Sequence, residues 1–159
     1  MGVTMPYEIT LPGGQKKKVN MADCINVART PNARQMILEG KFNRIITEKE
    51  SVIVEKEFFY TDFQRNQFFL VKPRFERHSW LEASAQLDRM LNRIPQTFKM
   101  DDGRQVRVIF GLAELREKLI ATDAGIDDRM VELLKVLVIQ DHPFRLKNQD
   151  CASCWKRKR

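Results

Sequence analysis

The sequence predicts an α+β fold, with a small antiparallel sheet and hairpins in the N-terminal half and helices mainly in the C-terminal half. Two patterns predict it. Short runs that alternate apolar and polar residues fill the first half of the chain, whereas apolar residues recur at helical spacing in the second half. The 159 residues, 43% hydrophobic and 31% charged, suffice for a core without a disulfide or a metal.

The first half of the sequence predicts strands on both sides of one helix. Residues 7–11 alternate and end in a Pro-Gly-Gly turn, so residues 15–19 are expected to return as a partner strand. A helix begins at Thr30-Pro31, because proline suits the first helical position, and Gly40 closes it. Three more strands are expected, at residues 42–47, 51–60 and 67–72.

The next segment predicts a helix and a hairpin. Ser79 and Glu82 have the spacing of a capping box, in which each side chain accepts a hydrogen bond from a free amide at the helix start. Pro95 ends this helix. Residues 97–100 and 105–110 are expected to pair around an Asp-Asp-Gly turn.

Two helices finish the predicted fold and meet at Asp123-Ala124-Gly125. The last one carries an apolar stripe at helical spacing and ends near Pro143. The stripe consists of Met130, Leu133, Leu134, Leu137 and Val138. We therefore expect one domain over residues 1–142 and a basic, cysteine-containing tail over residues 143–159.

Several segments, taken in order, resemble the CpXC family of bacterial and archaeal proteins. The resemblance runs from about Tyr7 to Leu137 and implies a fold, with no activity attached to it. The matching segments are Asp23-Cys24-Ile25-Asn26-Val27, Thr30-Pro31, residues 37–43, Phe59-Tyr60-Thr61-Asp62, residues 107–110, Glu117-Lys118 and residues 123–129.

The chain departs from this family in its cysteines. The resemblance implies a Cys-Pro-x-Cys pair and a second pair after the first helix, which together would hold a structural zinc ion. Residues 7–14 and 44–50 contain no cysteine, and Cys24 stands where the family has serine. We therefore expect a degenerate zinc ribbon, with no metal and no cofactor, whose first hairpin is held by the packing of Tyr7, Ile9 and Leu11.

The formal charge of +7 is concentrated at the C-terminus. The last four residues are Lys156, Arg157, Lys158 and Arg159; without them 24 basic residues remain against 21 acidic ones. Such a tail can bind RNA or DNA, or can simply keep a chain end solvated. No apolar run reaches the length of a membrane span and the N-terminus does not resemble a signal peptide, so we expect a cytoplasmic protein that binds no membrane.

Two groups of residues are candidate metal-binding sites, and each also has a simpler structural interpretation. Cys151 and Cys154 have the C-x₂-C spacing of a zinc-binding or redox pair. A zinc site needs two further ligands, which a second tail could supply in a dimer. The simpler interpretation is that they are ordinary reduced cysteines in the tail. Asp123, Asp127 and Asp128 could be paired carboxylates, but an aspartate at a helix start usually caps it.

A second set of residues offers binding. Arg74, Arg77, His78 and Trp80 adjoin a predicted helix start and form a candidate anion-binding cluster, or else a solvated loop. Tyr60 and Asp62 are a further polar pair.

Aromatic residues interleave with basic ones between residues 56 and 72 and can stack bases if one face of their strands is exposed. Because the other face must fill the core, at most half of them are expected to be free.

The chain lacks the motifs of nucleophilic, nucleotide-binding and dinucleotide-binding enzymes. We therefore expect a non-catalytic module that binds another protein or itself, through the aromatic sheet or the final helix pair. The alternative is a basic RNA- or DNA-binding protein that uses the Lys156–Arg159 tail and the Arg74–His78 cluster.

Overall fold

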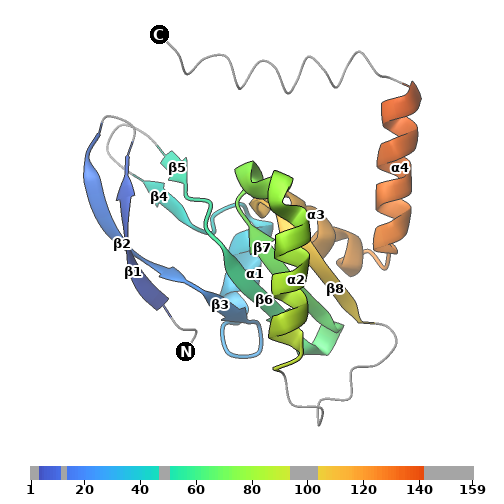
Figure 1. The fold of residues 1–159 in the computed structure, drawn as a ribbon, viewed down its shortest axis with the longest axis horizontal. Coiled ribbons are helices and arrows are strands. Elements are labelled where there is room, and N and C mark those ends of the chain that lie inside the picture. The colour runs from blue at the N-terminus through green and yellow to red at the C-terminus, as the bar shows by residue number, and fades with distance from the viewer. Residues whose placement is uncertain (1–3, 12–13, 47–50, 94–103, 142–159) are drawn as a thin grey trace. The chain divides into compact units, whose positions relative to one another are not determined.

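The computed structural model describes residues 4–11, 14–46, 51–93 and 104–141 (Figure 1). The chain divides into two compact units, Met1–Glu117 and Lys118–Arg159. The expectation of one domain over residues 1–142 stays a prediction. The predicted α+β class is confirmed, because sheets make up most of the first half and helices most of the second.

The first unit contains three small sheets, two α-helices, two short 3-10 helices and the first turns of a third α-helix among its described residues. In chain order its elements are β1 (Thr4–Thr10), β2 (Lys16–Ala22), β3 (Cys24–Asn26), α1 (Pro31–Leu38), β4 (Arg44–Ile46), β5 (Ser51–Ile53), β6 (Phe58–Asp62), η1 (Phe63–Arg65), β7 (Gln67–Lys72), η2 (Arg74–Ser79), α2 (Trp80–Leu91), β8 (Gln105–Phe110) and the start of α3 (Leu112–Asp123).

The central sheet has the strand order β3-β6-β7-β8 and is mixed. β6 and β7 form an antiparallel hairpin, while β3 runs parallel to β6 and β8 runs parallel to β7. α1 lies between β3 and β6 in the chain, and α2 lies between β7 and β8. Each of these connections is long enough to return the chain to the end of the sheet where the first strand began, so the next strand runs parallel to it. The antiparallel pairs predicted for the N-terminal half are present as β1–β2, β4–β5 and β6–β7, and the central sheet adds two parallel pairs. The hairpin partner expected for β8, residues 97–100, lies outside the described residues.

Two further two-stranded sheets are separate from the central sheet. The first, β1 with β2, confirms the predicted return of the chain after the Pro-Gly-Gly turn, with Tyr7 opposite Val19. The second pairs β4 with β5. The single strand expected at residues 51–60 is two strands, because the chain leaves one sheet after β5 and enters the central sheet at β6.

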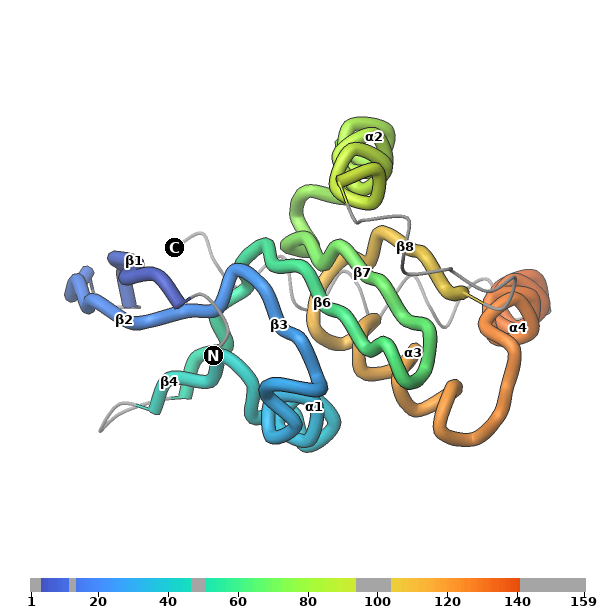
Figure 2. The backbone as a smooth tube through the Cα atoms, turned by 90° about the horizontal axis from the view of Figure 1, so that it is seen from below, coloured from blue at the N-terminus to red at the C-terminus, as the bar shows by residue number. Residues whose placement is uncertain are grey.

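Both faces of the central sheet are buried. Figure 2 shows α2 on one side of it and α1 on the other. The α2 side packs a cluster of Phe59, Phe68, Leu70, Ala83, Leu87 and Phe110. Phe58, Tyr60, Phe69 and Val71 alternate with these along β6 and β7 and are also buried, with Tyr60 and Phe69 stacked at 5.8 Å between ring centroids. The aromatic sheet therefore offers no exposed face for a partner.

The helix starts differ from the expectation at one point. α1 begins at Pro31 as predicted. The capping box at α2 is wrong, because the Ser79 hydroxyl donates to the carbonyl of Glu76 at 2.8 Å and makes no cap for α2. Ser79 ends η2, so α2 continues directly from a 3-10 turn and the serine hydroxyl is used within that turn.

The second unit contains the rest of α3 and α4 (Asp128–Asp141) among its described residues. The connection turns at Gly125, which has a left-handed backbone conformation (φ 68°). None of the helices in the described part of the chain has both the length and the apolar character needed to cross a bilayer.

Candidate functional sites

Two sequence segments that are more than thirty residues apart meet at the carboxyl ends of the parallel strands β3 and β6. Asn26 ends β3, and its carbonyl accepts hydrogen bonds from the amide and the hydroxyl of Thr30, 2.8 Å each, which folds the loop before α1. Asp62 ends β6, and the Val27 amide donates to the neighbouring carbonyl of Thr61 at 2.9 Å. This edge, where the chain leaves parallel strands for helices, is a common position for ligand sites.

Asp62 is the centre of this edge. Asp62 is 1% exposed. Its carboxylate caps η1 by accepting hydrogen bonds from the amides of Gln64 (3.1 Å) and Arg65 (3.2 Å). Its second oxygen accepts from the guanidinium of Arg65 at 3.1 Å and lies 3.8 Å from Nε of Arg34 on α1. One carboxylate therefore faces two guanidinium groups.

Tyr60 lies on the same strand and is fully buried. Burial raises the pKa of its hydroxyl to about 12, against the opposing charge of Arg34. The hydroxyl therefore stays protonated at neutral pH and is a neutral group. Of the polar pair predicted from the sequence, Asp62 binds the arginines and Tyr60 packs in the core.

A cavity of about 360 Å³ opens beside this cluster. Its lining combines apolar residues, amides and three charged groups, and both arginines contribute to it. The lining residues are Val27, Ala28, Pro31, Arg34, Gln35, Asp62, Phe63, Gln64 and Arg65. No sequence motif identified Arg34 or Arg65, since each is a single arginine on a short helix. The only available signals were the helix start at Pro31 and the spacing of three between Asp62 and Arg65.

The predicted Arg74–Trp80 cluster lies on η2 and the start of α2, and the charge of Arg77 is paired within the protein. Arg77 forms an ion pair with Glu114 at 2.5 Å and lies over the ring of Phe110. The backbone amide of Arg74 donates to Glu55, and His78 is within 3.0 Å of the carbonyl of Phe75. Trp80 is 56% exposed. The structure thus places Arg74, Arg77, His78 and Trp80 on one exposed segment, and its use as an anion site stays a prediction.

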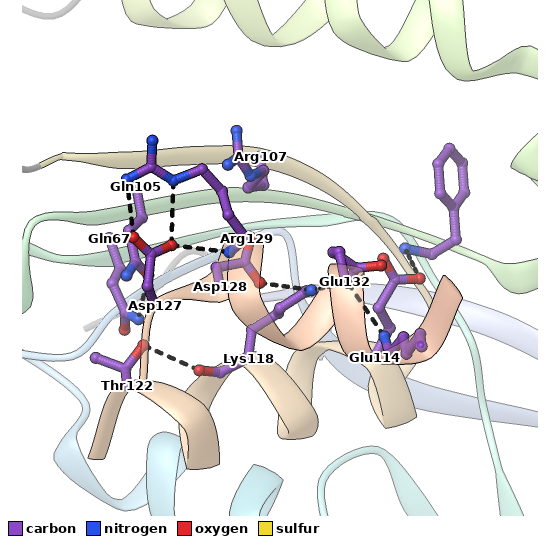
Figure 3. Close-up of polar contacts among 12 residues, drawn as sticks. Gln67, Gln105, Arg107, Glu114, Lys118, Thr122, Asp127, Asp128, Arg129 and Glu132 are labelled. Atoms are coloured by element: carbon purple, nitrogen blue, oxygen red, sulfur yellow. Dashed lines mark hydrogen bonds and ion pairs between the residues drawn. The ribbon is translucent and has the colours of Figure 1, made fainter. Parts of the chain in front are cut away.

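Of the aspartates between the last two helices, Asp127 acts as the capping interpretation predicted. Asp127 precedes α4 and accepts a hydrogen bond from the amide of Arg129 at 2.8 Å, and its other oxygen pairs with the Arg129 guanidinium (Figure 3). Asp128 lies 2.5 Å from the ammonium of Lys118 on α3.

Lys118 connects α3 to one edge of α4. Its side chain is 5% exposed and also pairs with Glu132, which in turn contacts Lys135 at 3.1 Å (Figure 3). Burial alone would lower the pKa of Lys118, but its bonds to the two carboxylates raise it above the ordinary value. The hydrogen bond from Lys118 correspondingly lowers the pKa of Glu132. Asp128, Glu132 and Lys135 follow each other at helical spacing, so they form a charged edge of α4.

The opposite side of α4 is apolar and exposed. We define the apolar arc of α4 as Met130, Leu133, Leu134, Leu137 and Val138, and about half of each side chain is accessible to solvent. Val136 and Ile139, elsewhere on α4, are also about half exposed. Nine of the seventeen exposed large hydrophobic residues described belong to the second unit, although this unit contributes only residues 118–141. An apolar surface so concentrated is a candidate interaction site.

The described residues offer little to bind a metal ion. No three His, Cys, Asp or Glu side chains in the described ranges come together as a metal-binding group. Cys24 is a free thiol whose burial raises its pKa, which disfavours the thiolate that zinc requires. Cys151, Cys154 and the Lys156–Arg159 tail lie outside the described residues.

The family assignment rests on a model match. The model of the family described as CpXC protein matches residues 9–135, which is most of the chain. The chain belongs to the CpXC family. The resemblance seen over Tyr7–Leu137 is thereby confirmed, and the elements that carry it in this CpXC protein include Asn26, Thr30-Pro31 and Asp62 at the edge of the central sheet. Searches of curated proteins and of solved structures gave no match.

The residues of this CpXC protein do not fit the family's four-cysteine metal site. β1, β2, β4 and β5 contain no cysteine, and Cys24 is the one cysteine within the described ranges. The β1–β2 hairpin is instead tied to the chain by Tyr7, whose hydroxyl donates to Asp23 at 3.0 Å, and by Lys56, whose ammonium lies 3.4 Å from the centroid of the Tyr7 ring.

Proposed function

We propose that this CpXC protein is a non-catalytic protein-interaction module and that the apolar arc of α4 is its contact surface. The observation that carries the proposal is the orientation of α4 within its unit. The charged edge of this helix binds Lys118 of α3, and the apolar arc is left exposed. In a helix that only completed a fold, the apolar side would face its neighbour and the charged side would face water.

The proposed occupant of the arc is a second copy of the chain. The arc carries no charge, so two copies of it do not repel each other electrostatically. Its residues also have a spacing that suits a two-fold contact. If two α4 helices run antiparallel about an axis between Leu133 and Leu134, these two residues meet their counterparts and Met130 meets Leu137. Each half-exposed side chain that is buried contributes about 1 kcal/mol.

The proposed interface is small. Two helices of 14 residues overlap over about 21 Å. Two helices that overlap over this length bury an area at the lower end of the range for specific interfaces. We therefore expect a dimer with a dissociation constant of roughly micromolar size.

The experiment is sedimentation velocity of the full chain between about 1 and 200 μM, a range that brackets such a constant. We expect the wild type to shift from monomer to dimer and Leu134→Lys to stay monomeric, because the charge would be buried at the centre of the interface. Ile46→Lys is the matched control: it makes the same kind of change at an exposed apolar residue on β4 and should dimerise like the wild type. A wild type that stays monomeric throughout, or Leu134→Lys that dimerises equally well, contradicts the proposal.

Nucleic-acid binding through the Lys156–Arg159 tail and the Arg74–His78 cluster is the second candidate. The exposed Trp80 beside two arginines favours it, whereas the pairing of Arg77 with Glu114 removes part of the charge that a phosphate would need. A gel-shift titration at low salt tests it, with a chain that ends at residue 155 as the comparison. Retardation that weakens steeply with salt and on removal of the tail would support this function, and no retardation would eliminate it.

A further inference from the structure

Two aromatic side chains on one short segment of the first unit are largely exposed. Phe75 on η2 is 72% exposed, and Trp80, the first residue of α2, is 56% exposed. Among the described residues, neither ring is paired with another aromatic ring or with a cation. Both rings are therefore available to a ligand.

An ordered backbone presents these rings. The amide of Glu76 donates to the carbonyl of Pro73 at 3.0 Å, and the hydroxyl of Ser79 donates to the carbonyl of Glu76 at 2.8 Å. Ser79 leads directly into α2, whose buried Ala83 and Leu87 pack on the central sheet. A ring on an ordered backbone loses little further freedom when a ligand stacks on it, which favours binding.

The side chains next to the rings are mainly basic. They are Arg74, Arg77 and His78, and all three are exposed. Arg77 remains 69% exposed although Glu114 binds its guanidinium. The one acidic residue of this segment, Glu76, is half-buried and lies 3.6 Å from the ammonium of Lys72. The exposed charges beside the rings therefore suit a polyanion, and stacking on the rings requires no unpaired charge.

Exposed aromatic rings beside basic side chains are typical of sites for single-stranded nucleic acids. A base stacks on a protein ring when it is not already stacked between its neighbours, which favours single strands over a duplex. We propose that Phe75 and Trp80 form a stacking platform for the bases of a single-stranded nucleic acid. Its phosphates then lie against Arg74 and His78. This inference rests on the nucleic-acid candidate function and adds to it the strand type and the stacking residues.

The test uses the full chain with the substitution Trp155→Phe, so that Trp80 is the only tryptophan and its fluorescence reports this site alone. The probes are oligodeoxythymidylate and oligouridylate of about 12 nucleotides, with a DNA duplex of the same length for comparison. At low salt we expect the single strands to quench the fluorescence of Trp80 saturably and the duplex to bind several-fold more weakly. The preference between thymidylate and uridylate distinguishes DNA from RNA.

The decisive variants are Trp80→Leu and its matched control Trp80→Phe, with binding followed by the fluorescence anisotropy of a labelled thymidylate strand. Trp80→Phe keeps an aromatic face and should bind within about twofold of the wild type, whereas Trp80→Leu keeps only an apolar side chain and should bind about fivefold or more weakly.

Three results would contradict the platform. If single strands bind and the two variants have equal affinity, the stacking role of Trp80 is wrong while the nucleic-acid candidate stands. If the duplex binds as tightly as the single strands, the strand type is wrong. If none of the probes binds, the platform and the nucleic-acid candidate both fail.

Discussion

The ammonium of Lys118 lies 2.5 Å from Oδ1 of Asp128, and the side chain of Lys118 is 5% exposed. A buried lysine is stable only when its charge is paired, so this contact and the neighbouring one to Glu132 determine which side of α4 meets α3. The orientation of the apolar arc is therefore a consequence of one charged side chain.

The first prediction concerns that side chain. Lys118→Met should destabilise the α3–α4 pair by about 1–3 kcal/mol, because Asp128 is left partly buried without its counter-ion. Lys135→Ala removes the other ammonium from Glu132 at a more exposed position and should cost less than about 0.5 kcal/mol. Hydrogen exchange of the α4 amides measures both values. Equal protection of α4 in the two variants would show that Lys118 does not hold the helix.

The second prediction separates the two contacts of Asp127. Asp127→Ala removes the cap of α4 and should destabilise this helix by about 1 kcal/mol. Asp127→Asn keeps an oxygen for the Arg129 amide and weakens the exposed ion pair with the Arg129 guanidinium, so its cost should stay below about 0.5 kcal/mol. The same exchange measurement applies. A loss in Asp127→Asn as large as that in Asp127→Ala would assign the stabilisation to the ion pair.

Local chemistry made some elements predictable from the sequence. The start of α1 follows from Pro31, the cap of α4 from Asp127, and the first hairpin from alternating residues on both sides of a turn. Each of these features depends on residues that are close in the chain, so the sequence alone contains the necessary information.

Other features depend on contacts between distant residues and could not be predicted. The alternating pattern of β8 identifies a strand but does not say that its neighbour is β7 or that the pairing is parallel. The Ser79–Glu82 spacing suggested a cap, but η2 precedes α2 without a break and uses the serine hydroxyl. The cavity beside Asp62 exists only because the β3–α1 connection and η1 meet across a parallel strand pair, and neither Arg34 nor Arg65 belongs to a recognisable motif.

The third prediction concerns pH. The hydrogen bond from Lys56, opposed by burial and aided by Tyr7, lowers the pKa of Asp23 below its ordinary value of 3.8. A carboxyl group with a lowered pKa in the folded state stabilises the fold above that ordinary value, and this contribution is lost as the pH falls through the lowered pKa. The difference in unfolding free energy between wild type and Asp23→Asn should therefore be largest near neutral pH and shrink between about pH 4 and pH 2.

Urea denaturation across this range, followed by circular dichroism, measures the difference. Glu8→Gln is the control, because Glu8 is an exposed carboxylate on the same hairpin and pairs with the exposed Lys16. Its effect should be below about 0.5 kcal/mol at every pH. A pH-independent difference for Asp23→Asn would mean that the charge of Asp23 does not stabilise the hairpin.

The fourth prediction concerns Gly111, which joins β8 to α3 with φ at 92°. A Cβ at this position would overlap Cγ of Arg74 and lie 3.1 Å from a carboxylate oxygen of Glu55. Gly111→Ala should therefore destabilise the first unit for two reasons, the left-handed backbone, worth about 1–2 kcal/mol, and the overlap with Arg74. A double-mutant cycle with Arg74→Ala separates them, since removing the arginine side chain relieves the overlap and leaves the backbone strain. We expect Gly111→Ala to cost less in the Arg74→Ala background than in the wild type. An equal cost in both backgrounds would show that the backbone conformation alone requires glycine at this junction.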